Sequence, residues 1–232
     1  MAPTDNQPGS GVETKKHTVL LVDDHPVVRE GLALRINREP DFAVCGTAGD
    51  GPEMMSAIAR LNPEVVVMDL ELPRSHGLEL LRDVYSQYPR LPVIVFSTHD
   101  EGVYAERAVR AGARGYLMKH EPPQRLLEGM RTVLGGGYAL SRAVSDRLLA
   151  AFAGPPSVQS ECLIAGLGNR ELEVFQFIGR GKGTKEIANL LNLSVKTVET
   201  YRERLKKKLN VRSGPDLARR AVLWVEANGV EQ

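Results

Sequence analysis

The sequence predicts an α/β domain with a five-stranded parallel sheet, followed by a small all-α domain. In the first 137 residues, short apolar runs alternate five times with segments of helical periodicity, which is the pattern of a parallel sheet covered by helices. After residue 167 the periodicity is helical only. The charge divides in the same way: residues 180–220 hold twelve Lys/Arg and four Asp/Glu, an excess of +8 in a chain of net charge +1, so the remainder carries about −7. The basic part favours nucleic acid as a partner, although a solvated helix face would show the same charge.

The length and composition are those of a soluble globular protein with one large or two small domains. The two cysteines, Cys45 and Cys162, lie far apart and indicate neither a disulfide framework nor a zinc site, so we expect reduced thiols in a cytoplasmic protein. No apolar run reaches the roughly 18 residues that a membrane span needs. Residues 1–16 are polar and lack the apolar core of a signal peptide, and we expect a disordered tail there.

Each of the five apolar runs is short and rich in β-branched or aromatic residues, as expected of buried strands. They span residues 18–22, 42–46, 65–68, 92–96 and 115–119. The helical patterns that follow them span residues 27–36, 52–61, 78–84, 104–111 and 126–134. The alternation predicts a parallel sheet covered by helices on both faces, and all crossovers between parallel strands should be right-handed.

Polar side chains stand where four of these strands end. Asp23 and Asp24 follow the first, Asp69 follows the third, and Ser97 and Lys119 close the fourth and fifth. Because the carboxyl ends of parallel strands meet at one edge, we expect these groups to converge there. The simpler alternative for Asp69, that it only caps the next helix, becomes less favourable for that reason.

The chemistry of such a cluster points to a phosphorylation site. Three neighbouring carboxylates repel one another unless a cation joins them, and Mg²⁺ is the oxygen-seeking cation that also binds phosphoryl groups. Asp69 can act as a nucleophile that forms an aspartyl phosphate, while Lys119 and the Ser97 hydroxyl can contact phosphoryl oxygens. His25 could be a further metal ligand, but a His-Pro pair at this place more often starts a helix.

These motifs resemble the receiver domain of two-component response regulators, over about residues 18–135. The matching residues are Asp23-Asp24, Asp69-x-x-Leu72-Pro73-x-x-x-Gly77, Ser97 and Gly115-Tyr116-Leu117-Met118-Lys119. The resemblance implies a flavodoxin-like sheet of order 2-1-3-4-5, and phosphorylation of Asp69 by a sensor histidine kinase. It implies that Mg²⁺ is held by the side chains of Asp24 and Asp69, by the main-chain carbonyl of Glu71, and by Asp23 through water. It also implies that Ser97 and Tyr116 form the switch pair and that Lys119 pairs with the phosphoryl group.

Two segments depart from the receiver pattern. His120-Glu121 separate Lys119 from the prolines at 122 and 123, whereas many receivers have a proline directly after the lysine, often with a cis bond. Arg74-Ser75-His76 is an unusual run in the loop after Asp69 and could alter the lifetime of the phosphorylated state.

A joining segment separates the two predicted domains, which we place at residues 17–137 and 167–228. Within residues 138–166 we expect a short amphipathic helix at 141–152 and a Pro/Gly/Ser-rich linker at 154–160. Domains joined in this way usually move relative to one another.

The last part of the sequence predicts a helix-turn-helix. Asn169 and Thr184 are candidate N-caps of two helices, and Ser194 opens a long basic helix that continues to Leu209, before a final helix at 215–225. The second helix of such a motif enters the DNA major groove. The exposed face of the long helix should comprise Lys196, Thr197, Thr200, Arg204, Lys207 and Lys208. A generic basic helical bundle is the alternative.

Four segments of this part resemble the LuxR-type DNA-binding domain, over about residues 167–224. They are 169–174, 185–188, 194–202 and 208–213. With the receiver-like half, the chain resembles the NarL/FixJ class of response regulators. The expected DNA contacts then also include Thr184, Lys185, Ser194 and Glu199, and the expected dimer surface comprises Leu217, Val222 and Trp224. Glu199 could accept from a cytosine amine but not contact phosphate favourably, and Tyr201 stands where the family often has His, so the bases read stay open.

We therefore predict a cytoplasmic, phosphorylation-dependent transcription regulator that binds paired DNA half-sites as a homodimer when phosphorylated or on DNA. One alternative is an enzyme, a haloacid-dehalogenase-like phosphatase, but this would need an Asp at the position of Glu71. Another is a receiver that binds a partner without phosphate, which the intact acids, Ser97 and Lys119 disfavour.

Overall fold

A computed structural model describes residues 16–73, 75–153, 164, 166–191 and 193–227 of the 232-residue chain. The expected disordered tail and the linker at 154–160 lie almost entirely outside these residues. The chain forms two compact units: residues 1–97, 112–115 and 121–139, and residues 98–111, 116–120 and 140–232. The bounds of these units differ from the predicted domain bounds, residues 17–137 and 167–228, and the domain bounds stay a prediction.

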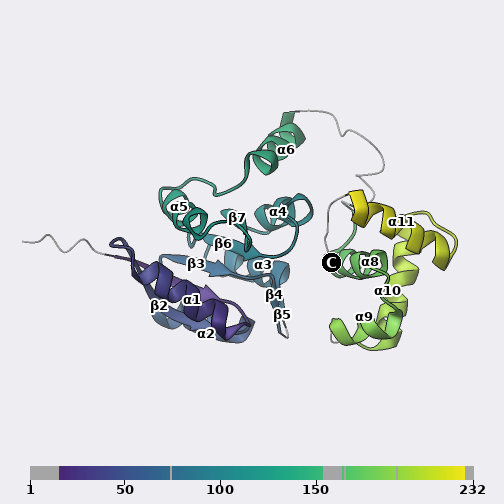
Figure 1. Cartoon of the computed structure of the whole chain (residues 1–232), viewed down its shortest axis with the longest axis horizontal. Helices are drawn as coiled ribbons and strands as arrows, with labels where there is room; N and C mark the ends of the chain where they lie inside the picture. Colours follow the sequence, from purple (N-terminus) through teal and green to yellow (C-terminus); the bar gives the residue numbers. More distant parts are fainter. Residues whose placement is uncertain (1–15, 74, 154–163, 165, 192, 228–232) are drawn as a thin grey trace, which may run out of the picture. The chain divides into compact units, whose positions relative to one another are not determined.

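The central sheet has five strands in the order β2-β1-β3-β6-β7 (Figure 1). The strands are β1 (His17–Val22), β2 (Phe42–Ala48), β3 (Val65–Met68), β6 (Val93–Ser97) and β7 (Gly115–Met118). Pairing of β1 with β2, β1 with β3, and β3 with β6 is parallel. The predicted order 2-1-3-4-5 is confirmed, because the two extra strands, β4 (Glu71–Leu72) and β5 (Ser75–His76), form a separate antiparallel pair.

The middle strand, β3, lies between two neighbours and is buried along its whole length. Its sequence Val-Val-Val-Met suits this position, since β-branched side chains pack well on a pleated surface covered on both faces. The register pairs Val22 of β1 and Val95 of β6 with Met68. The residues that follow β1 and β3 are therefore neighbours at the carboxyl edge of the sheet.

Five helices belong to this α/β fold, and their positions agree with the predicted helical segments. They are α1 (Pro26–Asn37), α2 (Gly51–Leu61), α3 (Gly77–Gln87), α4 (Glu101–Arg110) and α5 (Pro123–Leu134). α2 packs beside α3, whereas α1 is joined to α5 by a 2.8 Å hydrogen bond from Arg35 to Gln124. Arg131 of α5 further pairs with Glu39 and Asp41, which precede β2.

The expected short helix after the α/β fold is α6 (Arg142–Ala153). It packs against α4, where the Ser141 hydroxyl donates to Glu101 Oε1 at 2.8 Å and Val144 is buried. No helix in the described part of the chain is long and apolar enough to cross a membrane.

The remaining helices form a bundle, called here the helical bundle: α8 (Asn169–Gly179), α9 (Thr184–Leu190), α10 (Val195–Lys208) and α11 (Gly214–Ala227). α8 packs against α10 and α11, and α9 packs against α10 (Figure 1). The shared core consists of apolar side chains at helical spacing. It includes Leu172, Phe175, Ile178, Ile187, Val198, Leu205, Leu209, Leu217 and Ala221. At the α8–α11 contact, Gly179 lets the backbones approach closely, because a Cβ there would lie 2.5 Å from the carbonyl oxygen of Ala221.

Two of the predicted N-caps are displaced by one residue. Gly168 and Gly183 hold the cap positions, and Asn169 and Thr184 are the first helical residues. The reason lies three residues into each helix, where a glutamate reaches back to the cap: Gly168 N donates to Glu171 Oε2 at 2.7 Å, and Gly183 N donates to Glu186 Oε2 at 2.8 Å. The predicted cap at Ser194 is confirmed, since its hydroxyl accepts from Thr197 N at 3.0 Å.

Candidate functional site

Asp69 lies directly after β3 and is 3% exposed. The main chain holds it in place, because Asp69 N donates to the Val22 carbonyl of β1 at 2.8 Å. Its Oδ1 accepts three hydrogen bonds, from Leu70 N at 2.6 Å, from the Ser97 hydroxyl at 2.8 Å and from Glu71 N at 3.3 Å. The N-cap of the following helix α3 is His76, so Asp69 does not cap that helix. The predicted meeting of Asp69 and Ser97 at the sheet edge is confirmed.

Asp23, Asp24 and His25 form a second cluster at the end of β1. Asp23 is buried, its Oδ1 accepts from His25 N at 2.8 Å, and its carbonyl accepts from Arg29. The three side chains offer ligand atoms within 4.8 Å of one another. Asp24 Oδ1 is buried and, among the described residues, accepts no hydrogen bond, although His25 Nδ1 lies 2.6 Å away. Ligand atoms this close together suit a bound cation, and the predominance of carboxylate oxygens among them suits Mg²⁺.

The loop after Asp69 is held by Gly77, the first residue of α3. A Cβ at this position would lie 2.4 Å from the carbonyl oxygen of Leu70, so only glycine lets the helix begin against the backbone next to Asp69. Glu71 pairs with His76 in the short β4–β5 ladder, and its side chain is exposed. Arg74, part of the unusual run in this loop, is outside the described residues.

Tyr116 and Lys119 belong to the last strand of the sheet and its end. Tyr116 is fully buried in β7, and its hydroxyl donates to the carbonyl oxygen of His99 at 2.8 Å. Its ring is therefore already in the inward orientation. Lys119 follows the last residue of β7. The described residues contain no cis peptide bond. Of the two prolines after Lys119, Pro122 is the N-cap of α5 and Pro123 is its first residue.

The predicted DNA-contacting face is on α10 and at the start of α9. Lys185, Lys196, Glu199, Thr200, Arg204 and Lys207 are exposed, and Thr184 and Thr197 are half-buried. Along α10, a shallow pocket is lined by Ser194, Lys196, Thr197, Thr200, Tyr201 and Arg204. The Arg204 guanidinium lies 5.9 Å from the centre of the Tyr201 ring. This face thus gathers cationic and hydroxyl groups on one side of a helix whose other side is core.

Lys208 differs from the other predicted DNA contacts because it is already paired. Its Nζ lies 2.6 Å from Oε2 of Glu171, a side chain only 8% exposed. Burial raises the pKa of Glu171, but the hydrogen bonds from Lys208 and Gly168 N together lower it by more than burial raises it. The pKa of Glu171 therefore lies below its ordinary value of 4.5. The sequence does not predict this pair. The position of Glu171, three residues into a helix, indicates a capping role for its side chain, but nothing in the sequence points to Lys208 as its partner.

The expected dimer surface needs one correction. Leu217 is fully buried, because it lies on the same face of α11 as Ala221 and packs into the core of the helical bundle. Its side chain is therefore not part of a surface. Val222 and Trp224 are half-buried, and the Trp224 ring lies 5.8 Å from the ring of Phe175.

Comparisons with known proteins agree with both halves of this description. Residues 19–131 match the response regulator receiver domain, and residues 165–221 match the luxR family of bacterial regulatory proteins. An uncharacterized transcriptional regulatory protein, YxjL of Bacillus subtilis (strain 168), is 32% identical over 218 residues, which cover 94% of this chain and 98% of the relative. The oxygen regulatory protein NreC of Staphylococcus carnosus (strain TM300) is 32% identical over 208 residues, covering 88% and 96%.

Solved structures share the fold. A LuxR-family response regulator from Aurantimonas sp. SI85-9A1 is 32% identical and covers 60% of this chain and 100% of its own, with a TM-score of 0.55. RcsB of Salmonella typhimurium matches 89% of this chain and 97% of its own at 22% identity and a TM-score of 0.63. The chain therefore belongs to the NarL/FixJ class of two-component response regulators, which are phosphorylation-dependent, DNA-binding transcription regulators and not enzymes.

Proposed function

We propose that Asp69 is the phosphoryl acceptor and that its phosphorylation controls dimerisation and DNA binding by this chain. The observation that carries the proposal is the buried Asp69 carboxylate, oriented by the Ser97 hydroxyl beside the acidic cluster after β1. The donor is the phosphohistidine of a sensor histidine kinase. In the transfer, an Asp69 oxygen forms a bond to phosphorus while the bond from phosphorus to the histidine nitrogen breaks.

Mg²⁺ is the cofactor that these residues fit. Asp24 and Asp69 would hold it by their side chains, Glu71 by its main-chain carbonyl, and Asp23 through water. When bound, the ion neutralises charge on the phosphoryl group and on the carboxylates. The clustering of the Asp23 and Asp24 carboxylates with His25, whose ligand atoms lie within 4.8 Å of one another, supports this assignment.

Ser97, Tyr116 and Lys119 carry the response to phosphorylation. The Ser97 hydroxyl, which now donates to Asp69 Oδ1, can donate to a phosphoryl oxygen once that carboxylate is esterified. Lys119 supplies a positive charge to the phosphoryl group. Tyr116 is buried, in the inward position that we expect of the phosphorylated receiver.

The output is sequence-specific binding of double-stranded DNA through α10. Its exposed face, with Lys196, Thr200, Arg204 and Lys207, suits the major groove, and Thr184 and Lys185 at the start of α9 suit the phosphate backbone. Two bundles in a homodimer would engage paired half-sites, with Val222 and Trp224 of α11 at the contact. We propose that this activity takes place in the cytoplasm. We also propose that the receiver domain spans residues 17–137 and the DNA-binding domain residues 167–228.

Phosphorylation with labelled acetyl phosphate and Mg²⁺ tests the acceptor. We expect wild-type protein to take up label and Asp69→Ala to take up none, while Asp83→Asn, which alters an exposed carboxylate on α3, behaves like wild type. Full labelling of Asp69→Ala would refute the site. The same assay tests the metal requirement. Wild-type protein should take up no label when a chelator removes Mg²⁺ before acetyl phosphate is added, and uptake should recover when Mg²⁺ is returned.

A further inference from the structure

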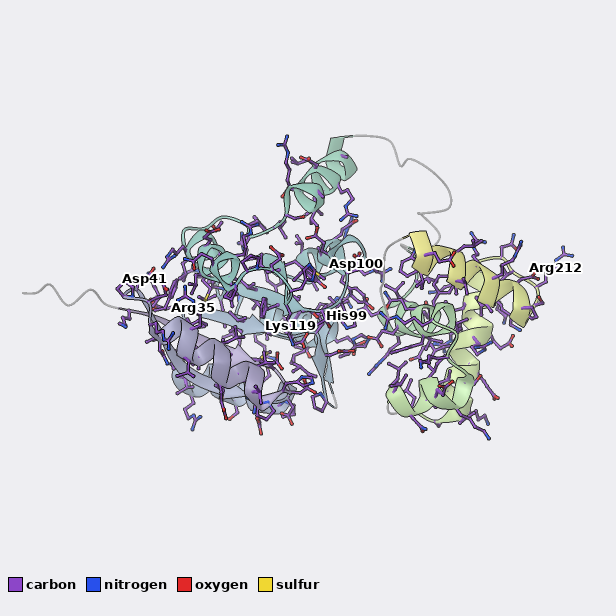
Figure 2. The ribbon with its side chains drawn as sticks, viewed as in Figure 1. Arg35, Asp41, His99, Asp100, Lys119 and Arg212 are labelled. Atoms are coloured by element: carbon purple, nitrogen blue, oxygen red, sulfur yellow. The ribbon has the colours of Figure 1, made fainter. Side chains whose placement is uncertain are left out.

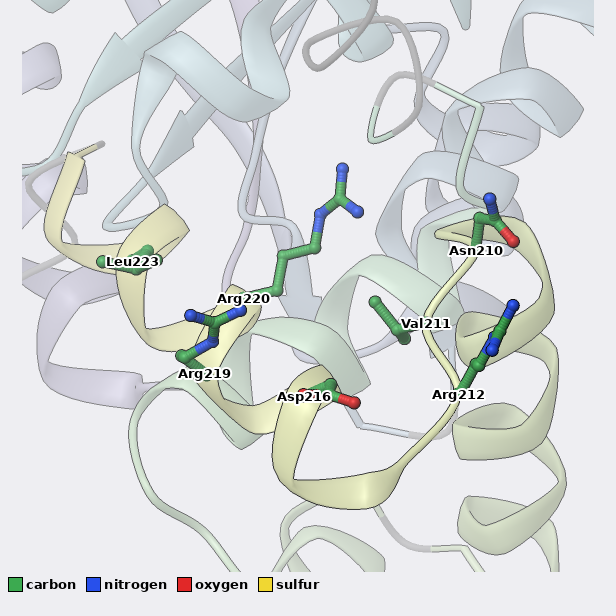
Figure 3. Close-up of a pocket in the computed structure, with 7 residues that line it drawn as sticks. All are labelled: Asn210, Val211, Arg212, Asp216, Arg219, Arg220 and Leu223. Atoms are coloured by element: carbon green, nitrogen blue, oxygen red, sulfur yellow. The ribbon is translucent and has the colours of Figure 1, made fainter.

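The helical bundle carries a pocket away from the expected DNA-contacting face of α10. It lies between the loop after α10, residues 210–212, and one side of α11 (Figure 3). Asp216, Arg219, Arg220 and Leu223 line it from α11. It shares no residue with the pocket along the DNA-contacting face of α10. A ligand here would therefore not compete directly for the side chains that are expected to read DNA.

Three guanidinium groups and one carboxylate give the pocket lining a net charge of +2. Arg220 serves the bundle itself, since its Nη1 donates to the carbonyl oxygen of Leu209 at 2.9 Å. Asp216 is held by the Ser213 hydroxyl, which donates to its Oδ2 at 2.6 Å. Arg212 and Arg219 are exposed and, within the described ranges, form no ion pair, and Arg212 extends away from the ribbon (Figure 2). These two cations are available to a ligand.

The pocket lining also includes two apolar side chains, Val211 and Leu223. Leu223 is 57% exposed and Val211 is half-buried, and they line the pocket from α11 and from the loop after α10 (Figure 3). Arginine is enriched in protein–protein interfaces, and here Arg212 and Arg219 line the same pocket as an exposed leucine. Burying the remaining leucine surface would strengthen such a contact, and an arginine fork binds a carboxylate with two parallel hydrogen bonds.

We propose that this pocket binds a segment of a partner protein that presents acidic side chains around an apolar one. A DNA backbone fits less well, because a phosphodiester buries no apolar group against Leu223 and is repelled by Asp216. A second copy of this chain fits less well too, because a symmetric contact centred on the pocket would bring two surfaces of charge +2 together. An acidic, leucine-bearing segment satisfies the arginines and Leu223 at once.

Binding of a synthetic peptide to the full chain tests the proposal. The probe is a helical 15-residue peptide with leucines four residues apart and Asp or Glu around them, and the control peptide has serine for each leucine. We expect Arg219→Ala and Leu223→Ser each to weaken probe binding about tenfold. Lys196→Ala, which removes a cation from α10, should leave binding unchanged, and the control peptide should bind about tenfold more weakly than the probe.

Four outcomes would overturn the proposal. Equal probe binding by all variants, or equal binding of both peptides, would mean that the contact is only diffuse electrostatic attraction. A loss of duplex DNA affinity in Arg219→Ala as large as in Lys196→Ala would assign the pocket to the DNA backbone. Loss of dimer in Leu223→Ser, measured by sedimentation, would assign it to self-association. Unfolding midpoints of the variants, which should match wild type because both side chains are exposed, separate these results from misfolding.

Discussion

At the scale of single residues, Gly77 links the fold to the phosphorylation site. Gly77→Ala would place a Cβ 2.4 Å from the Leu70 carbonyl oxygen and 2.6 Å from Leu70 Cα. Because both contacts are with backbone, the loop next to Asp69 must shift, and we expect a loss of about 1–3 kcal/mol in the free energy of unfolding together with slower phosphorylation. Urea unfolding and the rate of labelling by acetyl phosphate measure the two effects.

Gly31→Ala is the matched control, since Gly31 lies within α1 and a Cβ there meets nothing within 4 Å. It should stabilise the protein by about 0.5–1 kcal/mol because alanine is the better helix former. If Gly77→Ala proved as stable as Gly31→Ala, the close approach of α3 to Leu70 would not constrain the loop.

The Glu171–Lys208 pair predicts a pH dependence of stability. The pKa of Glu171 is lower in the folded protein than its ordinary value of 4.5, so the stabilisation is fully present above about pH 4.5 and is lost as the pH falls through the folded pKa. Glu171→Gln should therefore lose about 1 kcal/mol at pH 7 and show a shallower fall of stability in acid. Unfolding at a series of pH values tests this, with Glu203→Gln, whose side chain is 64% exposed, as a control that should change neither quantity.

At the scale of elements, α10 depends on its N-cap, Ser194, the residue before its first turn. Ser194 accepts a hydrogen bond from Thr197 N, and Ser194→Ala should reduce stability by about 1 kcal/mol because it leaves a donor of the first turn without a partner. Thr200→Ala removes a hydroxyl from the same helix, one that donates to the Lys196 carbonyl already used by the helix, and should be nearly neutral. Thermal unfolding compares them, and an equal loss in both variants would contradict the capping role.

The exposed face of α10 predicts the salt dependence of DNA binding. Lys196→Ala and Arg204→Ala should each weaken binding to a duplex and reduce the slope of log affinity against log salt by about 0.9, as expected when one phosphate contact is lost. Arg142→Ala, which removes a 95% exposed charge from α6, is the control and should leave the slope unchanged. Unchanged slopes in the first two variants would remove α10 from the DNA interface.

The sequence predicts the elements of this molecule better than their ends. The short, β-branched run Val65–Met68 favours a buried strand, and the acid after it is a local signal. The cap positions at Gly168 and Gly183 escaped prediction, because glycine carries no capping side chain and the deciding groups are glutamates three residues later. Leu217 was misplaced on a surface, although its spacing of four from the buried Ala221 was visible in the sequence.

At the scale of the whole molecule, what the sequence could not predict comes from long-range pairing. Ser97 meets Asp69 across 28 residues and Lys208 meets Glu171 across 37. The first meeting follows from topology, because parallel strands end at one edge of a sheet. The second depends on how α8 packs against α10, which no local pattern encodes.

Phosphorylation of the receiver and DNA binding by the helical bundle should be coupled through the dimer. An aspartyl phosphate adds charge and acceptor oxygens in a buried place, so it can bias the receiver between two conformations only by interacting differently with each. We expect acetyl phosphate with Mg²⁺ to shift wild-type protein toward a dimer in sedimentation and to raise its affinity for a duplex. Asp69→Ala should show neither change, whereas Asp83→Asn should show both. Because two linked bundles bind paired sites far more tightly than one, dimer formation and DNA affinity should rise at the same degree of phosphorylation. A rise in DNA affinity without dimer formation would place the control within each monomer instead.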